Sequence, residues 1–212
     1  MYCFFKQPQL NIYNNALTST ELMVFKKTNN QYQHCQIVNQ LNLLNLIRSL
    51  DPEFQTKLPS VAINCTQSQF TNVVISDALI NLQHQIYPRN LRIEITLGKS
   101  LKQINLLIAQ AENYRQHGIQ VSLDAVDQIT NFDVVAPFIL QTREIKFGLN
   151  GRNTDRQLLQ FWQTAARRNR KRFIVYNVET DDDIDLLDDL DIALRQGNYY
   201  SEADKLITEQ SA

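Results

Sequence analysis

Six polar or charged side chains lie at the ends of short runs of β-branched and aromatic residues, which are typical of strands. Glu21 opens one such run, and the others lie at or just after the end of one: Asn64, Glu94, Asp124, Lys146 and Glu179. Carboxylate and amide oxygens are the ligands that Mg²⁺ and Mn²⁺ prefer. A bound hard cation polarises a phosphoryl oxygen and lowers the pKa of a bound water. A lysine nearby would stabilise the charge of a phosphate. If these side chains meet, the residue types point to phosphoryl chemistry.

Any one of these side chains could instead cap a helix, so their joint position depends on the elements that carry them. Strands are expected at 2–5, 21–25, 61–65, 91–96, 119–123, 144–147, 173–176 and 192–194. Helical periodicity covers 34–50, 67–86, 99–117, 131–139, 153–169, 181–190 and 202–209. This alternation predicts a mostly parallel sheet, and eight strands predict a closed α/β barrel with the polar side chains at one opening. Because no helical pattern separates the first two strands, the first is expected to run antiparallel to the second.

Composition favours a single domain over residues 1–212. The chain has 43% hydrophobic residues, a net charge of −1 and three scattered cysteines. A balanced charge gives no general attraction to nucleic acid or to anionic membranes, and unpaired cysteines are typical of a reducing cytosol. The sequence shows no signal peptide and no apolar run of about 20 residues. A cytoplasmic protein is expected.

The order and context of these residues resemble the EAL domain family across nearly the whole chain. The matching segments are Gln7-Pro8, Glu21-Leu22-Met23, Val61-Ala62-Ile63-Asn64, Glu94-Ile95-Thr96, Leu123-Asp124, Ile145-Lys146, Val178-Glu179-Thr180 and Gln196-Gly197. Each match is short, and their order and spacing make the resemblance specific. The resemblance implies a modified (β/α)8 barrel of the TIM type with an antiparallel first strand.

The resemblance also implies cyclic di-GMP as ligand, with two divalent cations as cofactors. The first cation would be held by Glu21, Asn64, Glu94 and Asp124, and the ligand would be contacted by Gln7, Lys146 and Gln196. The second cation would share Asp124 with two further carboxylates. Those two positions hold Ala125 and Tyr176 here, and neither side chain binds a hard cation or accepts a proton near neutral pH. We therefore expect at most one Mg²⁺ or Mn²⁺ and no second metal site.

Other departures from the family pattern affect the ligand and the loop beside it. Where the family has an arginine that contacts phosphate, this chain has Phe25. Leu97 replaces the second glutamate of the motif that Glu94-Ile95-Thr96 resembles, and Gly148 replaces the aspartate that follows the lysine equivalent to Lys146. In the family, two consecutive aspartates stand at the positions of Asp124 and Ala125, and the loop after them is glycine-rich. Residues 126–129 contain no glycine here, so this segment cannot adopt that loop's conformation without a conformational free-energy cost.

These features favour a degenerate EAL-type domain without turnover, which acts through a protein partner and binds cyclic di-GMP weakly or not at all. The alternative is a slow phosphodiesterase that works with one cation and retains Lys146 and Glu179. A third possibility is a nucleic-acid-associated regulator that uses the basic run at 167–172. We prefer to interpret that run as the basic end of a helix. A homodimer is left open.

Overall fold

Two long strands at the start of the chain form a hairpin, β1 (Tyr2–Asn11) and β2 (Ala16–Thr28). They pair antiparallel from Tyr2↔Lys26 to Asn11↔Ala16. A turn at residues 12–15 joins them, and it ends at Asn15 with a positive φ of 51°, a conformation that asparagine tolerates better than most residues. The predicted antiparallel first strand is confirmed, and both strands are longer than the sequence suggested.

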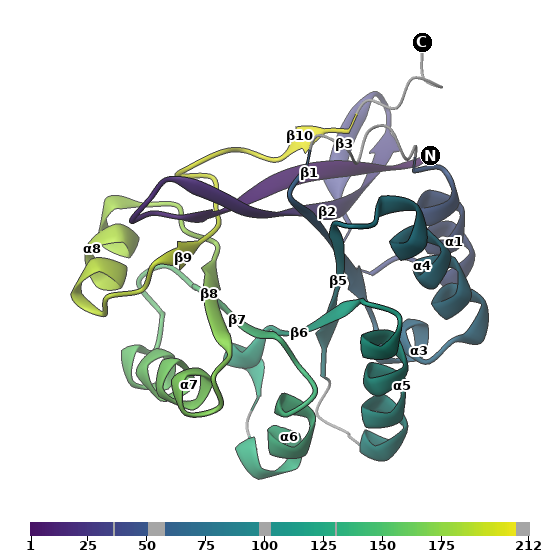
Figure 1. Cartoon of the computed structure of the whole chain (residues 1–212). Helices are drawn as coiled ribbons and strands as arrows, with labels where there is room; N and C mark the ends of the chain where they lie inside the picture. Colours follow the sequence, from purple (N-terminus) through teal and green to yellow (C-terminus); the bar gives the residue numbers. More distant parts are fainter. Residues whose placement is uncertain (36, 51–57, 98–102, 130, 207–212) are drawn as a thin grey trace.

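The computed structural model describes residues 1–35, 37–50, 58–97, 103–129 and 131–206. Six strands continue from β2 around a ring: β4 (Ser60–Cys65), β5 (Asn90–Thr96), β6 (Gln120–Asp124), β7 (Glu144–Gly148), β8 (Arg172–Tyr176) and β9 (Leu194–Arg195). They are parallel to β2 and to one another, and β9 pairs antiparallel with β1 to close an eight-stranded barrel (Figure 1). Two short strands extend the sheet, β3 (Gln31–His34) beside β2 and β10 (Asp204–Lys205) beside β1. The predicted barrel is confirmed.

Helices lie outside the ring and cover the parallel strands (Figure 1). They are α1 (Gln40–Arg48), α3 (Gln67–Phe70), α4 (Val73–Ile86), α5 (Ile104–Gln116), α6 (Phe132–Ile139), α7 (Arg156–Arg168) and α8 (Asp181–Asp189), with a 3₁₀ turn, η1 (Val126–Gln128), after β6. The start of α8 follows from its sequence, because Thr180 and Asp183 form a reciprocal capping box. The basic end of α7 at Arg167 and Arg168 favours the helix dipole, as expected.

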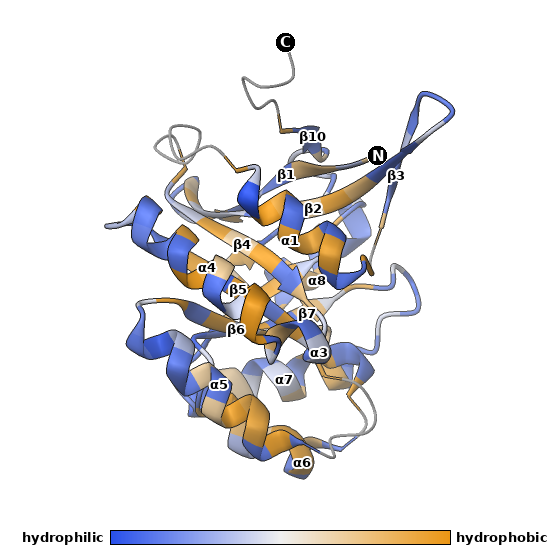
Figure 2. Cartoon of the chain, turned by 90° about the vertical axis from the view of Figure 1, so that its right-hand side faces the viewer, coloured by the Kyte–Doolittle hydropathy of each residue, from blue (hydrophilic) through white to orange (hydrophobic). Residues whose placement is uncertain are grey.

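The apolar core lies between the barrel wall and the helices (Figure 2). Its strand residues include Ile63, Ile93, Leu123 and Ile145, which are fully buried. Because side chains alternate between the two faces of a strand, the neighbours of these residues point into the barrel. Apart from Ala62, those neighbours are polar, so the alternation turns mostly polar side chains inward and apolar side chains toward the helices.

Three predicted helices differ from the structure. The helix expected at 202–209 is wrong where the structure describes it, because β10 pairs there with β1, and 207–212 lie outside the described residues. The helix expected at 34–50 begins only at Gln40, after the unpredicted strand β3. The helix expected at 67–86 is two helices, because Asn72 caps α4 by accepting from the Ile75 amide. No helix in the described ranges is long and apolar enough to span a membrane.

Candidate functional site

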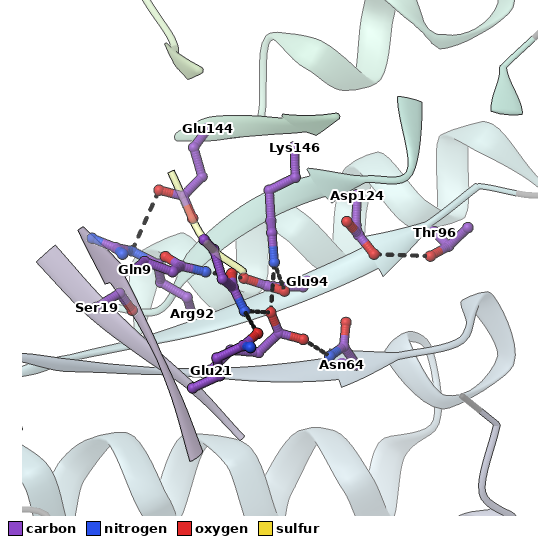
Figure 3. Close-up of polar contacts among 12 residues, drawn as sticks. Gln9, Ser19, Glu21, Asn64, Arg92, Glu94, Thr96, Asp124, Glu144 and Lys146 are labelled. Carbon is purple, nitrogen blue, oxygen red and sulfur yellow. Dashed lines mark hydrogen bonds and ion pairs between the residues drawn. The ribbon is translucent and has the colours of Figure 1, made fainter. Parts of the chain in front are cut away.

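The five side chains predicted for the centre of the site do meet inside the barrel, near the end where the parallel strands finish. We call that end the mouth and the inside of the barrel the lumen. Parallel pairing places Asn64 of β4 opposite Glu94 of β5. Lys146 of β7 and Asp124 of β6 point toward the same centre, where Glu21 of β2 completes the group (Figure 3).

Lys146 lies between two carboxylates. Its Nζ is 2.8 Å from Glu21 Oε2 and 2.5 Å from Glu94 Oε2. Lys146 is only 1% exposed, so water cannot supply the charge compensation that the ammonium needs. The three acids Glu21, Glu94 and Asp124 raise the pKa of Lys146 against the opposing effect of burial. We refer to these four residues as the ion cluster.

Glu21 is the best-compensated acid of the ion cluster. Its Oε1 accepts from Asn64 Nδ2 at 2.6 Å, and its Oε2 accepts from Gln196 Nε2 at 2.9 Å as well as from Lys146. Burial alone would raise the pKa of Glu21, but the Lys146 charge and these donated hydrogen bonds lower that pKa to about 2. Glu21 is therefore ionised at neutral pH.

Glu94 and Asp124 are compensated less well. Burial, together with the charge of Glu21, raises the pKa of Glu94 well above its usual range. Burial also raises the pKa of Asp124, to about 6, although the Lys146 charge opposes the shift. Thr96 Oγ1 donates to Asp124 Oδ2 at 3.4 Å, while Asp124 Oδ1 is buried without a hydrogen-bond partner in the described residues. Three acids thus share one ammonium, and the ion cluster has an excess of acidic groups.

A hard cation fits this donor set in charge and in ligand type. The three acids have only one ammonium to compensate their charge, and Asp124 Oδ1 has no hydrogen-bond partner in the described residues. Carboxylate and amide oxygens are ligands that suit Mg²⁺ or Mn²⁺. The present arrangement differs from a ligand shell, and in the described ranges no three His, Cys, Asp or Glu side chains are arranged to hold a metal ion. Lys146 lies between Glu21 and Glu94, and Asn64 turns its amide nitrogen toward Glu21. A cation held by the predicted ligands requires Lys146 to move and the Asn64 amide to turn.

The mouth side of Lys146 is occupied by an aromatic ring. Lys146 Nζ lies 5.2 Å from the centroid of the Tyr176 ring, which packs against Gly148, where a Cβ atom would meet the ring at 2.8 Å. Burial, followed by the charge of Asp124, raises the pKa of Tyr176, so its hydroxyl stays protonated at neutral pH. Ala125 has a positive φ of 54° and brings no ligand atom to this side of the ion cluster.

The predicted ligand-contact residues Gln7 and Gln196 lie beside Glu21. Gln196 Nε2 donates to Gln7 Oε1 at 2.9 Å as well as to Glu21, and Gln7 Nε2 donates to Asn198 Oδ1 and to the Ser201 carbonyl. Glu179 is exposed, and its backbone amide donates to Asp183 Oδ2 at 3.0 Å. The structure therefore joins the two glutamines to the ion cluster and places Glu179 at the start of α8.

Phe25 belongs to an aromatic patch beyond the mouth. It lies four residues after Glu21 on β2 and so shares the inward face of that strand. Its ring stacks on Phe5 with centroids 4.0 Å apart, and Tyr32 and His34 each pack against one of the two rings at 5.3 Å. We call these four residues the aromatic overhang. It places apolar surface where the resemblance expects a phosphate-binding arginine.

Sequence reasoning missed two polar residues that fix the site. Gln9, near the end of β1, is 1% exposed and donates from Nε2 to Glu94 Oε1 at 3.1 Å. Asp127, in η1, accepts from the Gly148 amide at 3.0 Å and adds its charge to the surroundings of Asp124. Strand alternation from Gln7 would have placed Gln9 in the lumen, but the first strand was expected to end at residue 5.

Solved structures of a phosphodiesterase and of two EAL domain proteins share this fold. PaMucR phosphodiesterase, in a complex with c-di-GMP, aligns with a TM-score of 0.75 at 16% identity over 100% of this chain and 99% of its own. The Bacillus subtilis YkuI protein, with c-di-GMP and calcium, aligns with a TM-score of 0.79 at 13% identity over 98% of this chain and 57% of its own. The Xanthomonas citri FimX EAL domain, with c-diGMP, has a TM-score of 0.75 at 12% identity over 98% and 89%.

The curated proteins contain no match to this chain. The family match rests on the sequence itself, because the EAL domain pattern extends over residues 3–203. That range includes all the strands of the closed barrel from Cys3 onward and every residue of the ion cluster. The chain therefore belongs to the EAL domain family.

Proposed function

We propose that this chain is a degenerate EAL domain, a regulatory module that acts through contacts with another protein and does not hydrolyse cyclic di-GMP. One observation carries the proposal. Beside Lys146 and Asp124, the two positions that the family resemblance assigns to second-cation ligands hold Ala125 and Tyr176. A two-metal site clamps both the attacking water and the scissile phosphate. Without the second cation, the attacking water is neither held nor deprotonated.

The proposal includes a residual site for one cation and for weak ligand binding. Glu21, Asn64, Glu94 and Asp124 would hold a single Mg²⁺ or Mn²⁺, and Gln7, Lys146 and Gln196 would face the ligand. The excess of acidic groups in the ion cluster and the unpartnered Asp124 Oδ1 support this cation. When bound, the cation would supply charge stabilisation for a phosphate.

A slow phosphodiesterase is the second candidate. Asp124, with a pKa raised to about 6 by burial, could take a proton from water near neutral pH, as general bases do. Asp127 lies close enough for its charge to act on Asp124, but its Oδ1 already accepts from the Gly148 amide. We favour the non-catalytic function because Asp127 Oδ1 is already hydrogen-bonded and the Tyr176 hydroxyl stays protonated, so neither side chain takes the place of the missing carboxylates.

The unmodified chain should show no hydrolysis of cyclic di-GMP above background with Mg²⁺ or Mn²⁺. Loss of each electrostatic contributor typically costs about 10²–10³ in rate, and two contributors are replaced here. Product formation should be followed by chromatography over hours at high enzyme concentration, beside calorimetric titrations with cyclic di-GMP, Mg²⁺ and Mn²⁺. Linear turnover that Glu21→Ala abolishes would establish the slow enzyme instead. Two bound cations per chain would contradict the single-cation site.

Phe25→Arg should raise the affinity for cyclic di-GMP by about ten-fold or more, because a charge-assisted hydrogen bond to phosphate contributes about 1.5–3 kcal/mol. Calorimetry of the variant and of Phe25→Lys provides the comparison. Lysine carries the same charge but cannot bind phosphate through two parallel hydrogen bonds, so it should gain less. Equal affinities of all three folded proteins would show that no phosphate lies beside position 25.

A further inference from the structure

The lumen below the ion cluster is lined by polar side chains, whereas bulky apolar residues usually fill the interior of an α/β barrel. Parallel pairing sets Ser122 of β6 beside Glu94 on β5 and beside Glu144 on β7. Arg92 lies two residues before Glu94, on the same face of β5, and pairs with Glu144 at 3.7 Å. Figure 3 shows Arg92, Glu144 and Gln9 on the side of the ion cluster away from Thr96 and Asp124. We call Gln9, Arg92, Ser122 and Glu144 the inner layer.

The inner layer is buried but incompletely hydrogen-bonded. Gln9, Ser122 and Glu144 are at most 1% exposed, and Arg92 is 5% exposed. Within the described residues, eight buried side-chain N or O atoms have no hydrogen-bond partner, and five of them belong to this layer: Gln9 Oε1, Arg92 Nη1, Ser122 Oγ, Glu144 Oε1 and Glu144 Oε2. Two more, Asp124 Oδ1 and Gln196 Oε1, belong to residues of the mouth. Glu144 Oε2 has ion pairs with Arg92 Nε at 3.7 Å and Arg172 Nη1 at 3.4 Å, but it accepts no hydrogen bond. Native proteins rarely leave such atoms without a hydrogen bond, so their concentration in one place points to a ligand.

The chemistry of the unpaired atoms selects that ligand. Glu144 and Gln9 present acceptor oxygens, while Arg92 Nη1 is a donor. A metal cation would satisfy the oxygens, but it would be repelled by the guanidinium groups of Arg92 and of Arg172, whose Nη1 lies 3.4 Å from Glu144 Oε2. An anion would satisfy the arginines but would be repelled by the Glu144 carboxylate. Water both donates and accepts, so it alone among these satisfies every unpaired atom of the layer.

We propose that the inner layer is a binding site for ordered water molecules, which solvate the Glu144 carboxylate inside the barrel. A buried water makes about three hydrogen bonds, so the five unpaired atoms require roughly two molecules. Gln9 connects this site to the ion cluster, because its Nε2 donates to Glu94 while its Oε1 is left to accept from water. The site is thereby hydrogen-bonded through Gln9 to the candidate functional site above it.

The unmodified chain gives the first test, by magnetic relaxation dispersion of water ¹⁷O in solution and by a crystal structure at about 1.5 Å. About two long-lived waters bonded to Glu144, Ser122 and Gln9 are expected. The proposal is overturned if the side chains rotate to pair with one another in a dry lumen, or if the density refines as an ion.

Two substitutions at position 122 separate the water from the serine hydroxyl. Ser122→Val adds apolar bulk beside Glu144 and removes the hydroxyl, so it should displace at least one long-lived water and lower the melting temperature by about 4 °C or more. Ser122→Ala removes the same hydroxyl without adding volume, so it should keep the waters and melt closer to the unmodified chain. Equal losses in both variants, with the number of long-lived waters unchanged, would show that the hydroxyl alone matters and would refute the site.

Discussion

Lys146→Met should destabilise the fold by about 3–5 kcal/mol, the usual cost of removing one partner from a buried ion pair. The substitution leaves Glu21 and Glu94 buried without the ammonium that lies 2.8 Å and 2.5 Å from their oxygens. Chemical denaturation at pH 7 measures the loss. Lys6→Met is the matched control on the same sheet, because Lys6 is 39% exposed and 4.0 Å from Asp204, and such surface pairs contribute little.

The loss in Lys146→Met should shrink at acidic pH. Without the ammonium, the folded-state pKa of Glu21 rises above that of the unfolded chain, and the pKa of Glu94, which is already raised, rises further, so the folded state binds protons more tightly. Stability then increases as the pH falls through the raised folded values toward the unfolded ones. A loss of the same size at pH 7 and pH 5 would mean that Lys146 stabilises the barrel through packing rather than through charge.

Gly197→Ala should cost about 2–4 kcal/mol, because it adds backbone strain to a main-chain clash. Gly197 has a φ of +159°, and a Cβ atom there would lie 2.1 Å from the Val178 carbonyl oxygen and 2.4 Å from its nitrogen. Backbone cannot move aside as a side chain can. The preceding residue, Gln196, would be displaced from Glu21 and Gln7, so the substitution should also weaken any ligand binding.

Gly118→Ala is the control for Gly197→Ala. Gly118 also has a positive φ, +80°, but a Cβ atom there meets nothing within 4 Å. It should therefore show the strain without the clash, about 1 kcal/mol. Denaturation midpoints of the two variants separate the two contributions. Similar midpoints would show that the backbone at Val178 moves away from the added Cβ atom with little loss of stability.

The strand-end residues were predictable because parallel strands bring their carboxyl ends together whatever the details of packing. Asn64, Glu94, Asp124 and Lys146 could thus be assigned to one site from their position at or near the ends of apolar runs, and Glu21 from its position at the start of one. Their protonation and pairing could not be assigned. Burial raises the pKa of Asp124, while the Lys146 charge and three donated hydrogen bonds depress the pKa of Glu21. Both shifts depend on contacts between distant parts of the chain, which no local pattern encodes.

The errors arose where tertiary pairing overrides local preference. Residues 202–206 have the composition of a helix, but Lys205 lies opposite Phe5 on a strand about 200 positions earlier, and context of this kind outweighs propensity. The polar strand β3 has no apolar alternation and exists because β2 extends beyond the barrel to pair with it. Gln9 was missed because the first strand was expected to end at residue 5, and Glu144 was missed because a buried polar residue at the start of a strand resembles a solvent-facing one in sequence.

The way the barrel closes has a consequence for how the chain folds. β1 pairs with β2 within the first thirty residues, but its other edge meets β9 at Leu194 and Arg195 and β10 at Asp204 and Lys205, all more than 180 positions later. Contacts so distant in sequence form late, because a long loop must be ordered first. Until then the hairpin exposes an unpaired edge, which invites association with other chains. The hydrogen bonds from Gln196 to Gln7 and Glu21 cross this late seam. The candidate site is therefore completed in the last step of folding, and its seam is where the native barrel should open first.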